Sequence, residues 1–187
     1  EGLEYTGKAP TRHLLWIIVE EIGEKKFKSL VKRKLDGLNL APFYGCYLVR
    51  PSKALRFYEN PERETCLEDL TEWVGAKPTE YSGSRACCGF PILTINEKAA
   101  LKMVGNHTST AKDLGADAMV TPCPLCHLNL DQYQNRAAGM MKREIDIPII
   151  HVPQLVGLAL GLDPKELKIN KHIISTKKLL SEISLRP

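Results

Sequence analysis

One segment constrains the fold more than any other, because an apolar strand runs directly into the start of a helix. Residues 116–122, ADAMVTP, are typical of a buried β-strand. The sequence CPLCH follows, and Pro124 suits the first turn of a helix because no backbone N–H is needed there. Cys123 and Cys126 therefore lie at a strand-to-helix junction. Such junctions are typical of parallel sheets, whose strands are joined by helical crossovers.

The rest of the chain repeats this alternation of strands and helices. Three further strands are predicted, at 38–49, where the strand runs into a Gly-Cys turn, near 78–83 and at 146–152. The alternation predicts an α/β fold with a mainly parallel sheet flanked by helices on both faces. Helices are predicted at 14–22 and 24–37, from Asn60 to Gly75, from Asn96 to Gly115, from Pro124 to Met141, after Pro153, and at 171–185.

The predicted elements form one domain, because no linker, internal repeat or low-complexity segment divides them. Residues 1–37 are interpreted as a helical lead-in and residues 38–187 as one α/β domain. Cys66 falls on the inward face of its helix and is expected in the core.

Five of the six cysteines follow a predicted strand. The carboxyl ends of parallel strands lie at one edge of the sheet, and ligands of such folds gather beyond that edge. We therefore expect these thiols to converge on one rim. They are Cys46 near the end of 38–49, Cys87 and Cys88 after 78–83, and Cys123 and Cys126 after 116–122.

Composition narrows the class of protein. At 187 residues the chain can bury a core without metal or disulfides, so its cysteines are available for another role. With 43% hydrophobic and 26% charged residues it is predicted to be globular, in a reducing, cytoplasmic compartment. No apolar stretch approaches the roughly 20 residues of a membrane helix. The net charge of +4 is modest and its basic runs carry few aromatics, so nucleic acid is not an expected partner.

Three chemistries compete for the five thiols. A structural zinc takes four ligands, and would leave one thiol over and use a pair without a spacer. A dithiol–disulfide enzyme would use CPLC but leave Cys46, Cys87 and Cys88 unexplained. An iron–sulfur cluster needs several soft thiolates from separate loops and accommodates adjacent cysteines. The pattern favours the cluster.

Three motifs resemble a known family. The segments CYLVRP (46–51), SRACCGFP (84–91) and CPLCHLNLDQYQ (123–134) are similar to the cysteine-rich CCG domain, especially in the carboxy-terminal half of the B subunit of heterodisulfide reductase. The resemblance covers nearly the whole chain. Members of this family carry two such domains in tandem, so this chain is interpreted as a fragment with a single CCG domain.

The resemblance implies a redox function within a complex. It implies an oxidoreductase of methanogenesis that reduces the disulfide of coenzyme M and coenzyme B, with electrons from a flavin subunit relayed through a ferredoxin-like iron–sulfur subunit. Two alternatives stay open: an electron-transfer or interaction module of succinate, lactate or sulfur metabolism without disulfide chemistry, and a zinc-stabilised scaffold. The implied cofactor is a noncubane [4Fe-4S] cluster, with Cys46, Cys87, Cys88, Cys123 and Cys126 as ligands.

Other residues are secondary candidates. Gly89 would let backbone amides approach the cluster, and His127 would either donate a hydrogen bond to a cluster sulfur or act as a surface or capping residue. His107 is expected to be a core residue, and His151 lies near the predicted rim. Lys53 and Arg85 would meet anionic substrate groups or be solvated.

Overall fold

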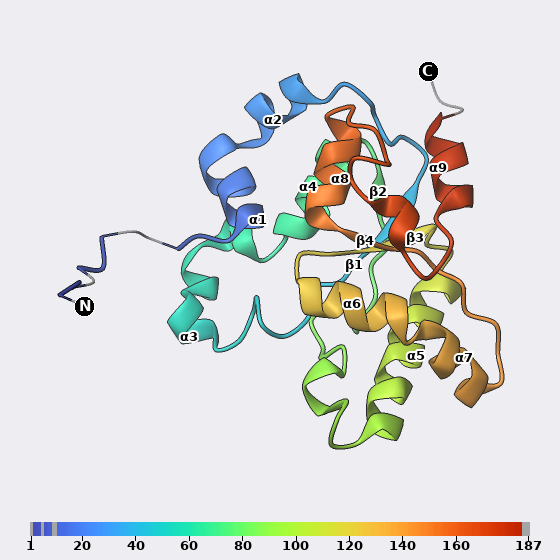
Figure 1. Cartoon of the computed structure of the whole chain (residues 1–187). Helices are drawn as coiled ribbons and strands as arrows, with labels where there is room; N and C mark the ends of the chain where they lie inside the picture. The colour runs from blue at the N-terminus through green and yellow to red at the C-terminus, as the bar shows by residue number, and fades with distance from the viewer. Residues whose placement is uncertain (1, 5, 9–10, 185–187) are drawn as a thin grey trace.

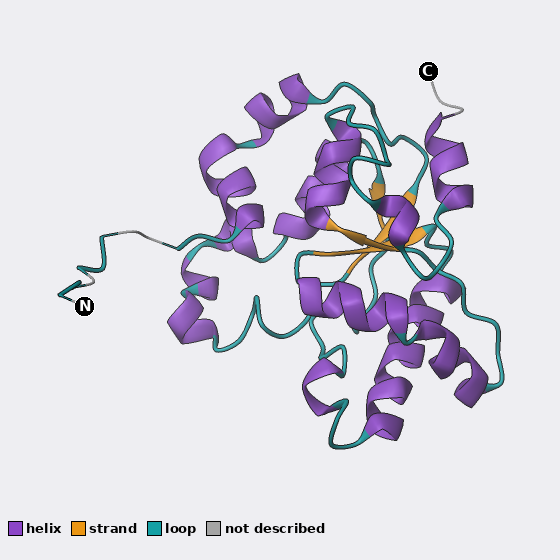
Figure 2. Ribbon diagram, in the orientation of Figure 1, coloured by secondary structure: helices purple, strands orange, loops and turns teal. Residues whose placement is uncertain are grey.

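The computed structural model describes residues 2–4, 6–8 and 11–184, and its centre is a parallel sheet of four strands in the order β2-β1-β3-β4. Figure 2 shows these strands enclosed by helices. The predicted α/β fold is confirmed. The strands are β1 (Asn39–Pro42), β2 (Lys77–Pro78), β3 (Ala118–Thr121) and β4 (Ile149–His151).

Helices cover both faces of the sheet, as Figure 1 shows. One face carries α4 (Cys66–Trp73) and α8 (Val152–Ala159), and the other carries α5 (Glu97–Asp113), α6 (Pro124–Gln132) and α7 (Gln134–Met141). The remaining helical elements are α1 (Leu14–Trp16) with a π-helical turn (Ile17–Ile22), α2 (Glu24–Leu30), α3 (Ser52–Leu55), α9 (Lys177–Ser184), and 3₁₀ turns at Phe57–Glu59, Pro61–Arg63, Phe90–Ile92 and Ile169–Lys171.

The strands alternate their side chains between two cores, as the pleat requires. Leu40, Val120 and Ile150 pack into the core that α4 and α8 cover. Ala41 and Met119 pack into the core beneath α5, α6 and α7. Because both faces are apolar, β1, β3 and β4 are almost continuously buried, which is typical of parallel sheets.

Several elements are shorter than the sequence predicted. The strand expected at 38–49 ends at Pro42, because the chain turns through Gly45, whose φ is +69°. The helix expected from Asn60 begins only at Cys66, after a 3₁₀ turn. The helix after Cys123 is interrupted at Tyr133. The last helix begins at Lys177 instead of 171, and residue 185 of that prediction lies outside the described residues.

The first helices pack into the main core. Leu15, Ile18 and Phe27 are buried in the same apolar cluster as Leu67 and Leu70 of α4. The division of the chain into 1–37 and 38–187 stays a prediction. Among the described residues, no helix combines the length and apolarity needed to cross a membrane.

A buried ion pair joins this first part to the rest of the chain. Arg63 donates to the carboxylate of Glu20, and the two side chains are 9% and 14% exposed. Arg63 also donates to the carbonyl of Leu55 at 2.8 Å and lies 3.9 Å from the centre of the Trp16 ring. The Arg63 guanidinium lowers the pKa of Glu20 below its ordinary 4.5.

We expect Arg63→Met to destabilise the protein by about 3–5 kcal/mol at pH 7, because it leaves a nearly buried carboxylate without its main partner. A carboxyl with a lowered folded pKa contributes its stability above the unfolded pKa and loses it as pH falls. The difference between wild type and variant should therefore shrink below pH 4.5. Urea unfolding of wild type and variant at pH 7 and pH 4 measures this difference in the free energy of unfolding. An equal difference at both values would contradict this role for the pair.

Candidate metal centre

Three loops meet at the carboxyl edge of the sheet. β1 lies between β2 and β3, so the chain leaves β1 at the point where the strand order reverses. Beyond β1, the N–H of Phe43 donates to Val120 of β3 at 2.8 Å, and the N–H of Tyr44 donates to Ser84 at 2.8 Å. These bonds fix the Cys46 loop to β3 on one side and to the loop of the cysteine pair on the other.

The five predicted thiols come together at this edge. Cys46 interacts with Cys87 and Cys88, and Cys126 hydrogen-bonds with Cys88 and Cys123. All five are free thiols. The predicted convergence is therefore observed, whereas the role of these residues as ligands stays a prediction. Within the described part of the chain, no three His, Cys, Asp or Glu side chains are grouped so as to hold a single metal ion.

Gly45 brings the backbone of the first loop against the sulfur of the last. A Cβ atom built on Gly45 would lie 2.6 Å from Cys126 Sγ, and the φ of +69° is itself unfavourable for other residues. The close approach needs glycine for both reasons. The sequence around Cys46 is thus adapted to the position of Cys126, eighty residues further along the chain.

The cysteine pair is held through its backbone. Asn129 Nδ2 donates to the carbonyl of Cys88 at 2.8 Å, and His107 Nε2 lies 3.0 Å from the carbonyl of Cys87. The N–H of Gly89 donates to Cys87 Sγ at 3.4 Å. These contacts fix the backbone of the cysteine pair. His107 is half-buried and hydrogen-bonded, which confirms the expectation of a satisfied core histidine.

Gly89 packs its backbone against α5. Its φ is +96°, and a Cβ there would lie 3.0 Å from the Cα and from the carbonyl oxygen of Ala100. The glycine therefore allows the loop of the cysteine pair to rest directly on the helix. Its expected contact with a cluster stays a prediction.

The thiols differ in acidity. Cys126 donates to Cys123, which lowers the pKa of Cys123 to about 6, and backbone N–H groups of Leu125 and Cys126 add to this effect. The same interaction raises the pKa of Cys126. Burial, then the neighbouring Cys87, raises the pKa of Cys46. Cys123 is consequently a thiolate at neutral pH, the form that binds metals.

Cys66 lies apart from this group. It is fully buried in the opposite core, where its thiol donates to the carbonyl of Arg63 at 3.2 Å. Burial raises the pKa of Cys66 to about 12. This confirms the prediction of a core cysteine.

The ring of His127 lies next to two other histidine rings near the rim. The His127 ring lies 5.8 Å from His151 and 4.7 Å from His172, measured between ring centres. Among the described residues, no hydrogen bond links the His127 ring to a cysteine sulfur. Its proposed contact with a cluster stays a prediction.

The side chain of Arg85 makes contacts within the protein. It donates to the carbonyl of Glu64 and lies 5.4 Å from the Tyr44 ring centre and 5.9 Å from that of Phe57. Arg85 is therefore not simply solvated, whereas its expected contact with a substrate stays a prediction.

A hollow of about 790 Å³ opens beside Cys46. Its lining comes from a single segment and includes two cations, Arg50 and Lys53, which form no ion pair with any described carboxylate. The lining residues are Cys46, Tyr47, Arg50, Pro51, Ser52 and Lys53.

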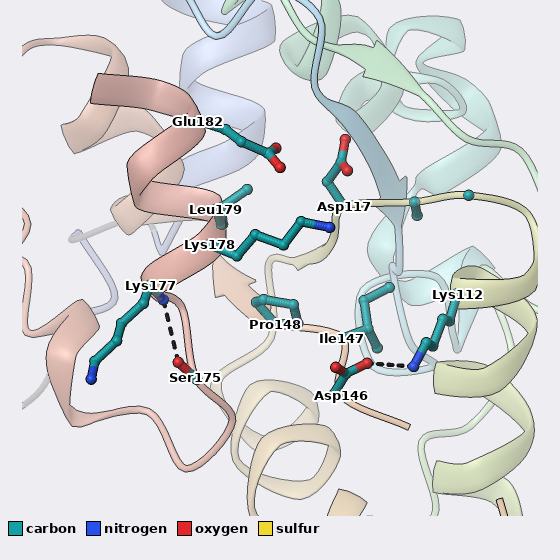
Figure 3. Close-up of a pocket in the computed structure, with 12 residues that line it drawn as sticks. Lys112, Asp117, Asp146, Ile147, Pro148, Ser175, Lys177, Lys178, Leu179 and Glu182 are labelled. Carbon is teal, nitrogen blue, oxygen red and sulfur yellow. Dashed lines mark hydrogen bonds and ion pairs between the residues drawn. The ribbon is translucent and has the colours of Figure 1, made fainter. Parts of the chain in front are cut away.

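A second hollow, of about 580 Å³, lies at the opposite edge of the sheet, before β3 and β4. Figure 3 shows Lys178 extending from α9 toward Asp117, and Lys112 paired with Asp146. Lysines and carboxylates balance one another in this lining. It contains no cysteine, so it is separate from the thiol site.

The fold and the site together define a thiol-rich α/β domain, in which cysteines of separate loops meet at the carboxyl edge of a parallel sheet. Residues 40–131 match the cysteine-rich domain family, CCG. This part of the chain belongs to the CCG family, as the three motifs indicated.

Curated relatives match most of this chain. The chain is 38% identical over 178 residues to the 8-methylmenaquinol:fumarate reductase membrane anchor subunit of Wolinella succinogenes, covering 95% of this chain and 62% of the relative. It is 34% identical to the B subunit of the ferredoxin/F(420)H(2)-dependent CoB-CoM heterodisulfide reductase of Methanosarcina acetivorans, covering 97% and 61%. The chain thus spans about three fifths of the length of these relatives.

A solved structure supports the fold alone. A hypothetical protein from Helicobacter pylori superposes with a TM-score of 0.60 at 18% identity, covering 81% of this chain and 28% of that one.

The sequence interpretation missed three residues of the site. Asn129 follows Cys126 by three positions, so helical spacing places both on one face of α6 and could have indicated it. Arg50 lies four residues after Cys46 and gave no distinctive signal. Tyr81 is brought near Cys126 only by the tertiary fold.

Proposed function

We propose that the chain is an iron–sulfur redox subunit whose rim binds a noncubane [4Fe-4S] cluster. The observation that carries this proposal is the contact among five free thiols from three separate loops. The proposed ligands are Cys46, Cys87, Cys88, Cys123 and Cys126.

The donor set fits a polynuclear iron centre. Thiolates are the ligands that iron–sulfur clusters use, whereas a structural zinc site takes four donors and would leave one of these thiols unused. Cys123 is a thiolate at neutral pH because of its partner Cys126 and the nearby backbone N–H groups. When bound, such a cluster passes electrons and offers iron as a Lewis acid for sulfur.

The proposed reaction is the reduction of a disulfide, with the coenzyme M–coenzyme B heterodisulfide as the candidate substrate. One sulfur–sulfur bond is cleaved, and two electrons and two protons yield two thiols. The hollow beside Cys46 would receive the disulfide, and Arg50 and Lys53 would bind its anionic groups. The Methanosarcina relative named for this reaction supports the assignment.

The electrons must come from other subunits in this proposal. A ferredoxin-like iron–sulfur subunit and a flavin subunit are the expected partners, in a cytoplasmic complex of methanogenic metabolism. The relatives named as subunits of reductases support a place in a complex.

A second candidate is an electron-transfer module without disulfide chemistry. It is favoured by the Wolinella relative, which is named as the membrane anchor subunit of a fumarate reductase. In that case the rim would pass electrons to a partner, and the hollow beside Cys46 would have no role in binding thiols.

Anaerobic purification with iron and sulfide analysis tests the proposal. We expect a brown protein with about four iron and four sulfide per chain. A colourless protein with one zinc would overturn it. For the cluster-containing protein, addition of a thiol separates the two candidates: a changed electron paramagnetic resonance spectrum of the oxidised protein supports disulfide chemistry, and an unchanged one supports the electron-transfer module.

A charge-matched series tests the two cations of the hollow. We expect 3-mercaptopropionate to change the spectrum at lower concentration than uncharged 2-mercaptoethanol, because Arg50 and Lys53 attract the carboxylate. The double variant Arg50→Gln and Lys53→Gln should remove this preference, raising the half-saturating concentration of the acid about tenfold or more. Lys98→Gln, on the exposed surface of α5, is the control. A preference retained in the double variant would exclude this hollow as the thiol site.

A further inference from the structure

Tyr81 carries a buried hydroxyl group without a partner. The residue lies in the loop between β2 and the cysteine pair. Its hydroxyl oxygen is closed off from solvent and makes no hydrogen bond within the described residues. Burying an unpaired hydroxyl costs about 1–3 kcal/mol, so most buried hydroxyls of folded proteins are bonded. This hydroxyl is therefore available to donate to a group bound at the site.

The Tyr81 ring packs next to the thiol site. Tyr81 packs against the apolar cluster that contains Phe43, Cys88 and Cys126. A Cβ built on Gly83 would lie 2.8 Å from Tyr81 Cε2, so the backbone closes directly over the ring and limits its movement. The hydroxyl cannot readily swing out to water.

The phenol is a proton donor in this position. Burial raises the pKa of Tyr81, and the nearby Cys126 raises it further, so the group stays protonated at neutral pH. Asn129 Oδ1 is also buried and without a hydrogen bond, but no hydrogen bond joins it to Tyr81. The five thiols of the site supply sulfur as an acceptor.

We propose that Tyr81 is a positioning residue that donates an O–H···S hydrogen bond to a metal-bound thiolate on the Cys126 side of the site. The inference rests on the proposed function, because the thiol accepts well only as a metal-bound thiolate. A hydrogen bond withdraws negative charge from the sulfur and so stabilises the more negative, reduced state. Tyr81 is therefore expected to raise the reduction potential of the centre.

The test compares Tyr81→Phe with Tyr133→Phe. Both variants remove one phenol hydroxyl, and both rings pack against the same apolar cluster. The measurements are iron and sulfide content, the midpoint potential, and the coupling of exchangeable deuterons in electron–nuclear double resonance after transfer to heavy water. We expect Tyr81→Phe to retain iron, to have a more negative potential and to lose one deuteron coupling. Tyr133→Phe should match the wild type.

The outcomes separate this inference from the proposed function. A wild type without iron and sulfide would overturn the proposed function and the inference together. An iron-containing Tyr81→Phe variant with unchanged potential and unchanged deuteron coupling would overturn the inference alone. So would a Tyr81 hydroxyl that is hydrogen-bonded to Asn129. If Tyr81→Phe loses iron, 3-fluorotyrosine at position 81 keeps the hydroxyl and makes it a stronger donor. Its potential should become more positive, and an unchanged value would overturn the inference.

Discussion

Cys87→Ala is expected to reduce the iron content of anaerobically purified protein by about tenfold or more, with loss of the brown colour. Mutation of residues that merely support a metal ligand already costs about 10–100-fold in affinity, and Cys87 is proposed as a ligand itself. Cys87 interacts with Cys46, and its carbonyl is held by His107. Iron and sulfide analysis, with circular dichroism to establish folding, measures the effect.

Cys66→Ala is the matched control. It removes a thiol of the same chain, but from the opposite core, where Cys66 is fully buried and bonded to Arg63. We expect it to retain iron while losing about 1–3 kcal/mol of stability, because the truncation leaves a small cavity. A folded Cys87→Ala protein with full iron content would remove Cys87 from the proposed ligands. Loss of iron in a folded Cys66→Ala protein would place the centre elsewhere.

The carboxyl edge of the sheet, where the thiols gather, could be predicted because the sequence patterns that define it are local. The apolar run of 116–122 and the proline after Cys123 together define β3 and the start of α6, and both were confirmed. Once the strands are parallel, every residue that follows a strand lies at the same edge. The gathering of Cys46, the cysteine pair and the CPLC thiols could therefore be predicted from their positions after strands.

What could not be predicted depends on contacts between distant segments. The Gly-Cys sequence predicts a turn after β1, but it does not predict that the strand ends as early as Pro42 or that Tyr44 bonds to Ser84. The break at Tyr133 divides a helix whose apolar spacing is continuous in sequence. Tyr81 and Asn129 acquire their environment only when the loop after β2 packs against α6. Periodicity describes which face a residue occupies, and it does not identify the atom across from it.

Gly45→Ala is expected to lower the iron content about as strongly as loss of a ligand, although it removes no thiol. The added Cβ would lie 2.6 Å from Cys126 Sγ, a distance that real Cβ contacts do not reach, so the sulfur or the loop must move. Either movement separates Cys126 from Cys46 on the neighbouring turn. The positive φ adds a backbone cost of about 1–2 kcal/mol.

Gly23→Ala separates the two effects of the substitution at Gly45, which are the contact with the Cys126 sulfur and the backbone strain. Gly23 has a similar φ of +75°, but a Cβ there would have no neighbour within 4 Å. Backbone strain should therefore cost both variants a similar amount of stability in urea unfolding, and Gly45→Ala should lose more in total because of its contact with Cys126. Only Gly45→Ala should lose iron, since only its methyl group meets a sulfur. Equal iron contents in the two folded variants would mean that the contact between Gly45 and Cys126 does not set the spacing of the thiols, and that the loop after β1 adjusts freely around the proposed ligands.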